Sequence, residues 1–139
     1  LIRNLQMSDL VNKYKEVRTK IQELQAEKTI LVKQIFTEAA KQLFNKWPQL
    51  KSFSWSQYTP YFNDGDTCVF SINHFEPEIN GVDYFDSEAS GMTNFEEVRD
   101  EVSDLLQQFD DNDFLAMFGD HAKVTVTVDG IEIEGIDHD

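Results

Sequence analysis

The first third of the chain carries apolar residues at alternating spacings of four and three positions. Lys28 is the one polar residue that interrupts this pattern. The apolar positions are Leu10, Tyr14, Val17, Ile21, Leu24, Leu31 and Ile35. Such spacing places an apolar side chain on one side of an α-helix at every turn, and it is typical of a coiled-coil seam of about four heptads. Because no Gly or Pro precedes Pro48, we expect one helix from about Asp9 to Asn45, capped at Ser8 or Asp9 and ended by Trp47-Pro48.

The length of this helix limits how it can be used. At ~1.5 Å per residue, residues 9–45 span about 55 Å, whereas a compact chain of this size has a radius of gyration of ~14 Å. We therefore expect the seam to form a homodimer. A parallel pair brings Lys13 near Arg18 of the other chain, whereas an antiparallel pair can bring Lys13 near Glu27, which favours the antiparallel arrangement. The alternative is a long helix packed on its own sheet, which would use Tyr14, Phe36 and Phe44.

Short alternating segments and turn signals follow Pro48. Residues 53–58 and 68–74 alternate as strands do, with a turn expected at residues 63–66, and Asn80-Gly81 predicts a second hairpin. Residues 123–134 predict a terminal hairpin that turns at Asp129-Gly130. Its expected buried side consists of Val124, Val126, Val128, Ile131 and Ile133.

Two helices are expected between these hairpins. Thr93 and Glu96 have the spacing of a capping box, and the helix after them has an apolar face formed by Phe95, Val98, Val102, Leu105 and Phe109. A shorter helix over residues 113–118 should end at Gly119. The order of elements predicts an α+β fold with an antiparallel sheet. The expected divisions are residues 1–6 as a tag or leader, 7–47 as the long helix and 48–139 as an acidic α+β domain.

Charge is distributed unevenly along the chain. The 139 residues carry 12 Lys/Arg and 26 Asp/Glu, a net charge of −14, and residues 52–139 hold 21 of the acids but only two basic residues. This excess disfavours direct binding to nucleic acid and favours a partner with a basic surface. A single Cys fits a reducing compartment. Neither a membrane span nor a signal peptide is evident, so we expect a cytoplasmic protein.

Nothing in the sequence indicates catalysis. Cys68 and His74 would lie ~20 Å apart on one strand, too far for a catalytic pair, so Cys68 is expected to be structural. Residues 120–121 and 137–139 (DH and DHD) and the acids near Asp64 and Asp83 match no metal-binding motif and suit turns instead. We therefore expect no enzyme, no cofactor and no metal ion. The alternative is a small-ligand binder or enzyme that uses Trp55, Tyr58, Tyr61, Phe62, Asp64 and Asp66.

Carboxylates crowd the polar side of the helix after Thr93 and continue beyond it. Like charges four residues apart destabilise a helix by a few tenths of a kcal/mol per pair, so their repetition needs a reason. Their ~6 Å repeat is similar to the phosphate spacing of a nucleic-acid strand. The alternative is a solvated helix face. The expected acidic face consists of Glu96, Glu97, Asp100, Glu101, Asp104, Asp110, Asp111 and Asp113.

Residues 55–66 (WSQYTPYFNDGD) and 118–139, which include the run VTVTVDGIE, resemble small acidic proteins encoded by tailed phages. The resemblance implies a phage protein in a bacterial cytoplasm, where such proteins often inhibit host enzymes. It thus implies a non-catalytic inhibitor of a basic host protein: a nuclease, another DNA-binding protein or a DNA-binding ATP-dependent protease. A virion scaffold protein is a further alternative. The resemblance assigns no individual residue.

Overall fold

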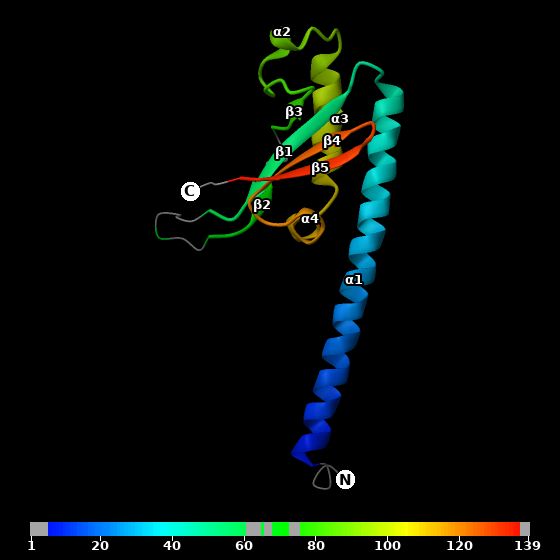
Figure 1. Cartoon of the computed structure of the whole chain (residues 1–139), viewed down its shortest axis with the longest axis vertical. Helices are drawn as coiled ribbons and strands as arrows, with labels where there is room; N and C mark the ends of the chain where they lie inside the picture. Colours follow the sequence, from blue (N-terminus) through cyan, green and yellow to red (C-terminus); the bar gives the residue numbers. More distant parts are fainter. Residues whose placement is uncertain (1–5, 61–64, 66–67, 73–75, 137–139) are drawn as a thin grey trace.

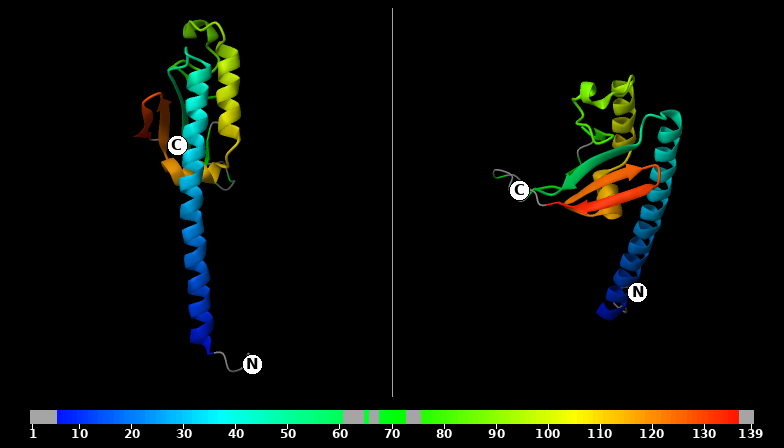
Figure 2. Two further views of the ribbon diagram at one scale, coloured as in Figure 1. Left: turned by 90° about the vertical axis from the view of Figure 1, so that its right-hand side faces the viewer. Right: turned by 45° about the horizontal axis from the view of Figure 1, so that its top comes forward.

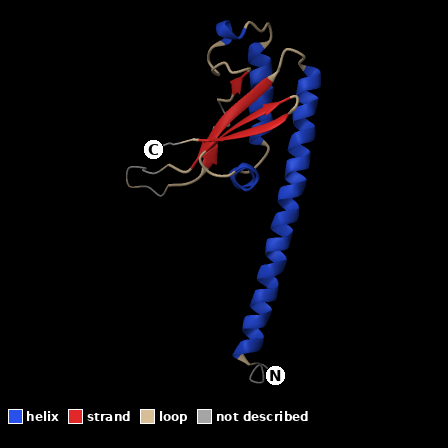
Figure 3. Ribbon diagram, viewed as in Figure 1, coloured by secondary structure: helices blue, strands red, loops and turns tan. Residues whose placement is uncertain are grey.

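The chain folds as an α+β protein in which a long helix precedes a small sheet and three further helices (Figures 1 and 3). The computed structural model describes residues 6–60, 65, 68–72 and 76–136. The elements are α1 (Met7–Lys46), β1 (Ser52–Tyr58), β2 (Ser71–Ile72), β3 (Glu78–Ile79), α2 (Ser87–Ser90), α3 (Phe95–Gln107), α4 (Asp111–Phe118), β4 (Ala122–Thr127) and β5 (Gly130–Gly135). The expected fold class and the long helix are confirmed.

The sheet is antiparallel in every described pairing and has the strand order β2-β1-β4-β5. β1 and β4 pair over six positions, from Ser52 opposite Thr127 to Gln57 opposite Ala122. The short strands β2 and β3 both pair with β1. Helices α1, α3 and α4 cover the same face of the sheet, which gives a two-layer body (Figure 2). The N-terminal half of α1 extends beyond this body (Figure 1).

Aromatic rings hold α1 to the sheet and to α4. Phe36 is fully buried, and its ring contacts the rings of Trp55, Phe109, Phe114 and Phe118 with centroids 5.9 to 6.2 Å apart. These contacts are edge-on, the geometry that aromatic pairs prefer. Further along the same face of α1, Ala40 and Phe44 are also buried. The second half of α1 is therefore part of the hydrophobic core.

A buried amide connects the sheet to the middle and the C-terminal end of α4. Gln57 on β1 is fully buried, and its Oε1 accepts a hydrogen bond from Trp55 Nε1 at 2.9 Å. Its Nε2 donates to the carbonyl oxygens of Phe114 at 3.0 Å and Gly119 at 2.6 Å. Burying an amide is costly unless its groups are bonded. The three bonds satisfy Gln57 and fix α4 across the end of β1.

The boundaries of several elements differ from those expected, and α4 begins at Asp111 rather than at residue 113. α1 begins at Met7 rather than Asp9, since Gln6 is its N-cap and Asp9 Oδ2 accepts a bond from the Gln6 N–H at 3.2 Å. The Thr93 capping box is wrong: α3 begins at Phe95 with Asn94 as N-cap. Of the segment 68–74, only Ser71–Ile72 is a described strand, and the expected turn at 63–66 lies largely outside the described residues.

The terminal hairpin forms, but its turn lies one residue earlier than expected. Thr127 pairs with Gly130, so Val128 and Asp129 form the turn and Val128 is 64% exposed. Ile133 is 53% exposed because β5 is an edge strand with a partner on one side only. The expected burial of Val128 and Ile133 is therefore wrong, whereas Val124 and Val126 are buried as expected.

Asp120 joins the end of β1 to the segment before β4. We expect its carboxylate to make the free energy of unfolding depend on pH in the acidic range. Burial alone would raise the pKa of Asp120, but interactions with the charged carboxylate outweigh this effect and lower the pKa. The carboxylate accepts hydrogen bonds from the Thr59 hydroxyl, the Thr59 N–H and the His121 N–H, each at 2.8 Å, and the His121 ring is close to it. The stabilisation is complete above the unfolded pKa of ~3.9 and is lost as the pH falls through the lower folded value.

We therefore expect Asp120→Asn to be less stable than wild type at pH 6 by less than ~1 kcal/mol, since the carboxylate is partly exposed and screened. The difference should shrink by pH 3. Urea unfolding of both proteins at the two pH values measures it. A difference that is constant between pH 6 and pH 3 would contradict the assignment.

Candidate interaction surfaces

The first 22 residues of α1 form an overhang that none of the other described elements covers. Every residue from Met7 to Lys28 is exposed, and Thr29 is the first that is partly buried. At 1.5 Å per residue the overhang is ~33 Å long. A solvated helix of this kind gains little from tertiary packing, which supplies most helix stability in proteins. The overhang is therefore the element of the molecule with the most to gain from a partner.

The helix seam, defined as Leu10, Tyr14, Val17, Ile21, Leu24, Leu31 and Ile35, is exposed throughout. At 3.6 residues per turn, the seam lies about 100° around the helix from the face that enters the core. Where the two faces run side by side the contrast is sharp: Leu31 and Ile35 are each 57% exposed, whereas Val32 and Phe36 are 9% and 0% exposed. The alternative in which α1 packs on its own sheet is therefore correct for Phe36 and Phe44, which are in the core. It is wrong for Tyr14, which is 64% exposed.

Lys28, which interrupts the seam, has a partner in the body. Its Nζ lies 3.2 Å from Asp113 Oδ1 on α4. The Asp113 side chain is only 12% exposed, and its Oδ2 also accepts the Asp110 N–H at 3.2 Å, which caps α4. Lys28 thus fastens the base of the overhang to α4.

The exposed acids of α3 lie opposite its buried side. Phe95, Val98 and Val102 face the core, as the apolar pattern predicts. Glu96, Glu97, Asp100 and Asp104 are all exposed, and the one described ion pair among them joins Asp100 to the neighbouring Arg99 at 3.4 Å. Within the described residues, this surface therefore carries an excess of negative charge that the chain itself does not neutralise.

Other members of the expected acidic face contact their own chain. The Glu101 carboxylate accepts bonds from Lys46 Nζ and from Trp47 Nε1 at the C-terminal end of α1. Asp113 is in the ion pair with Lys28. Asp111 is partly buried, and Asp110 is exposed at the start of α4. We therefore define the α3 acidic face as Glu96, Glu97, Asp100 and Asp104.

The aromatic stretch after Pro48 is mainly structural where it is described. Trp55 is 2% exposed and packs on Phe53 and Phe114. Tyr58 is partly buried, and Tyr61, Phe62, Asp64 and Asp66 lie outside the described residues. Because the Trp55 ring is in the core and its N–H bonds to Gln57, it is not available to a ligand at the surface.

The candidate catalytic and metal-binding residues do not converge in the described part of the chain. Cys68 is partly buried, while His74 and residues 137–139 lie outside the described residues. No group of three His, Cys, Asp or Glu suited to a metal ion occurs among the residues described. Asp83 Oδ1 accepts the Phe85 N–H at 2.9 Å, which is turn chemistry, as expected.

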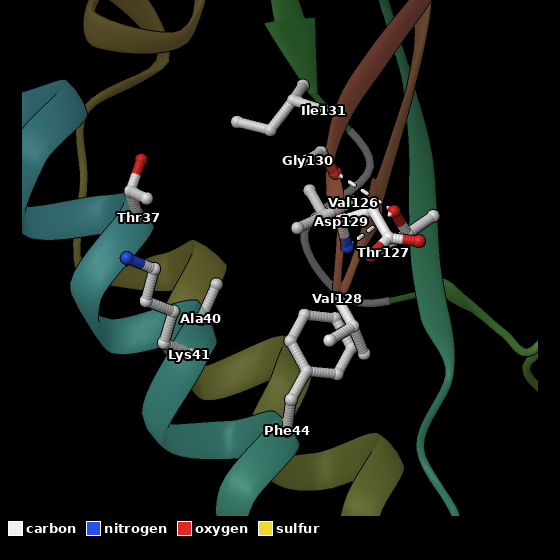
Figure 4. A pocket seen from close by; sticks show the side chains of 10 residues that line it. All are labelled: Thr37, Ala40, Lys41, Phe44, Val126, Thr127, Val128, Asp129, Gly130 and Ile131. Atoms are coloured by element: carbon white, nitrogen blue, oxygen red, sulfur yellow. Dashed lines mark hydrogen bonds between the residues drawn. The ribbon is translucent and has the colours of Figure 1, made fainter.

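A small notch separates α1 from the terminal hairpin (Figure 4). It has a volume of about 170 Å³ and is lined largely by apolar groups, including Ala40, Phe44 and Ile131. Its polar groups on the hairpin are used within the turn, since Thr127 Oγ1 accepts the Asp129 N–H at 3.2 Å and donates to Gly130 O at 3.3 Å. Lys41 and Asp129 also line the notch, but this small and largely apolar space has few of the convergent polar groups that orient a small ligand.

Comparisons with protein-family models, curated proteins and solved structures identify no relative of this chain. Among the described residues, no helix is both long enough and apolar enough to span a membrane. What the protein does is therefore inferred from its two exposed surfaces, the helix seam and the α3 acidic face.

Proposed function

We propose that the protein is a non-catalytic binding protein whose acidic body docks on a basic surface of a protein partner. The observation that carries this proposal is the α3 acidic face, four exposed carboxylates on one side of a helix that is fixed to the core. Because the helix that carries these carboxylates is already fixed, only their side chains and not the backbone have to be ordered on binding. They also accelerate the encounter with a basic surface.

The partner classes are those with a basic cleft: a nuclease, another DNA-binding protein or a DNA-binding ATP-dependent protease. The carboxylates repeat along α3 at a spacing similar to that of phosphates, so they would occupy a cleft that binds nucleic acid. Occupation of the cleft would inhibit the partner. A phage-encoded inhibitor of a host enzyme is the setting that the resemblance of residues 55–66 and 118–139 implies. No residue of the chain needs to perform chemistry in this proposal.

A triple charge reversal tests the role of the α3 acidic face. Glu97→Lys, Asp100→Lys and Asp104→Lys together should weaken binding ~100-fold, at roughly 1 kcal/mol per reversed charge. The matched control reverses three exposed acids of the β-strand region, Glu76, Glu132 and Glu134. Both variants change the net charge equally. A difference in their binding would therefore show a specific role for the α3 acidic face.

Affinity capture from bacterial lysate at low salt, with mass spectrometry of the bound proteins, compares the three proteins. Wild type and the control should retain the same partner, and the α3 variant should lose it. Retention should fall steeply as salt rises from ~50 to ~300 mM, and the captured partner should be displaced from duplex DNA by the wild type. Equal capture by the α3 variant would refute the role of this face.

A further inference from the structure

We propose that the helix seam binds a second copy of this chain as an antiparallel coiled coil in which residues 10–35 of the two chains overlap. Seven apolar side chains at heptad spacing, each at least 46% exposed, extend over about four heptads, the length at which such a pattern indicates a coiled coil. The neighbouring face of α1 is occupied by the core, so the seam is the side that a second helix can cover without displacing the body.

Charge on the two halves of the molecule selects the antiparallel orientation. The first part of α1, residues 7–22, has four basic residues and two acids, whereas residues 52–139 have two basic residues and 21 acids. A parallel pair would place both acidic bodies at one end, where they repel. An antiparallel pair separates the bodies and brings the basic start of each helix to the body of the other chain.

The limits of the seam fix the register. In this seam Leu10, Val17, Leu24 and Leu31 are at heptad position d, and Tyr14, Ile21, Lys28 and Ile35 are at position a. In an antiparallel coiled coil, each d residue faces an a residue of the partner. Centring the overlap between residues 22 and 23 matches every seam position of one chain with one in the other, except Val17, which faces the partner's Lys28. The opposing pairs are Leu10 with Ile35, Tyr14 with Leu31, Val17 with Lys28 and Ile21 with Leu24.

Residues that flank the seam support this register. It brings Lys20 of each chain beside the partner's Glu27, which gives two attractive pairs, and it places Arg18 beside the partner's Gln25. A register centred on residue 19 pairs Lys13 with the partner's Glu27, but it also brings both copies of Arg18 together and both copies of Lys20 together. That register leaves Ile35 uncovered as well.

Lys28 acts against the parallel dimer. In a parallel pair the two Lys28 side chains would meet in the same layer of the seam, whereas in the antiparallel register each lies opposite Val17. There its aliphatic stem can cover the seam while its ammonium group keeps the ion pair with Asp113 at 3.2 Å. A single charged residue within a seam is a known means of fixing orientation and register.

Two isoleucines on different sides of α1 provide a matched test. Ile21, 50% exposed, lies in the seam, and Ile30, 60% exposed, lies off it. By light scattering over a micromolar concentration series, wild type and Ile30→Glu should be dimers, and Ile21→Glu should dimerise at least ~100-fold more weakly. A monomeric wild type, or equal weakening by both variants, would overturn the proposal. Because both sites are exposed, circular dichroism should show both variants folded.

Disulfide trapping tests orientation and register in a Cys68→Ser background. Chains with Tyr14→Cys and chains with Leu31→Cys are mixed and oxidised, and we expect crosslinks between the two kinds of chain. Crosslinks only between identical chains would indicate a parallel dimer and overturn the orientation. Replacing the second chain with Leu24→Cys should reduce crosslinking to Tyr14→Cys, and a higher yield with that chain would overturn the register. Neither readout depends on the basic partner proposed above.

Discussion

Replacing Phe36 with alanine is expected to lower the free energy of unfolding by about 3–5 kcal/mol. The Phe36 ring is fully buried and contacts four other aromatic rings, from β1, α4 and the segment between α3 and α4. Its removal leaves a cavity at the place where α1, the sheet and α4 meet, and these elements cannot all close on it. Urea unfolding followed by tryptophan fluorescence measures the change, since Trp55 is one of the contacting rings.

Phe85→Ala is the matched control for this prediction. The Phe85 side chain is 71% exposed, and its described ring contact is with Tyr84. A surface truncation of this kind should change the free energy of unfolding by no more than ~0.5 kcal/mol. If Phe36→Ala were as mild as Phe85→Ala, the second half of α1 would not be part of the core.

Gln57→Glu should destabilise the fold by about 3 kcal/mol or more at pH 7, because a carboxylate cannot donate to the carbonyl oxygens of Phe114 and Gly119. A carboxyl group buried there should have a pKa above the ordinary value of ~4.3. The protonated form regains one donor, so the penalty should be smallest near pH 4 and should increase as the pH rises above the unfolded value. Urea unfolding at pH 4 and pH 7, relative to wild type at the same pH, measures it.

Gln108→Glu makes the same chemical change at an exposed position. It should alter stability by less than ~0.5 kcal/mol. A penalty for Gln57→Glu that did not depend on pH, or that matched the control, would show that the two donated bonds do not hold α4 in place.

Sequence periodicity was sufficient for the long helix and for the buried sides of α3 and β4. In α1 the pattern also separated two faces, because Phe36 and Phe44 stand beside the heptad positions rather than within them. Which of the two faces enters the core is decided by tertiary packing. Only the structure shows that Val32 and Phe36 are covered while Leu31 and Ile35 are not.

The sequence patterns did not predict where the terminal hairpin turns or which groups bond to buried polar side chains, and the reason can be stated for each. The expected turn at Asp129-Gly130 was one residue late because a preference for Gly in turns does not fix the strand register, which pairs Thr127 with Gly130. The inward position of Gln57 was predictable, because this residue continues the alternation of Phe53 and Trp55 on the inward side of β1. Its acceptors, however, are backbone carbonyls 57 and 62 residues away, and no local pattern identifies them.

The assignment of acidic residues to one surface was likewise only partly predictable. Helical spacing identified the exposed carboxylates of α3, but Glu101 and Asp113 contact Lys46 and Lys28, which lie on α1. Those pairings depend on how α1 crosses α3 and α4. The candidate surface is therefore smaller than the run of acids along the chain, and its members are better defined.

Because α1 continues without a break from Met7 to Lys46, the rise of the helix per residue sets the distances along it. In the antiparallel dimer that we propose, Ala40 of one chain and the partner's Ala40 would lie about 35 residues apart along the coiled coil, or ~50 Å. Two basic sites at that separation could be engaged at once, with the gain in avidity that a rigid spacer gives. Deleting one heptad within residues 10–35 would shorten this spacing by about 10 Å, so in such a dimer the length of the coiled coil would set the distance between the two bodies.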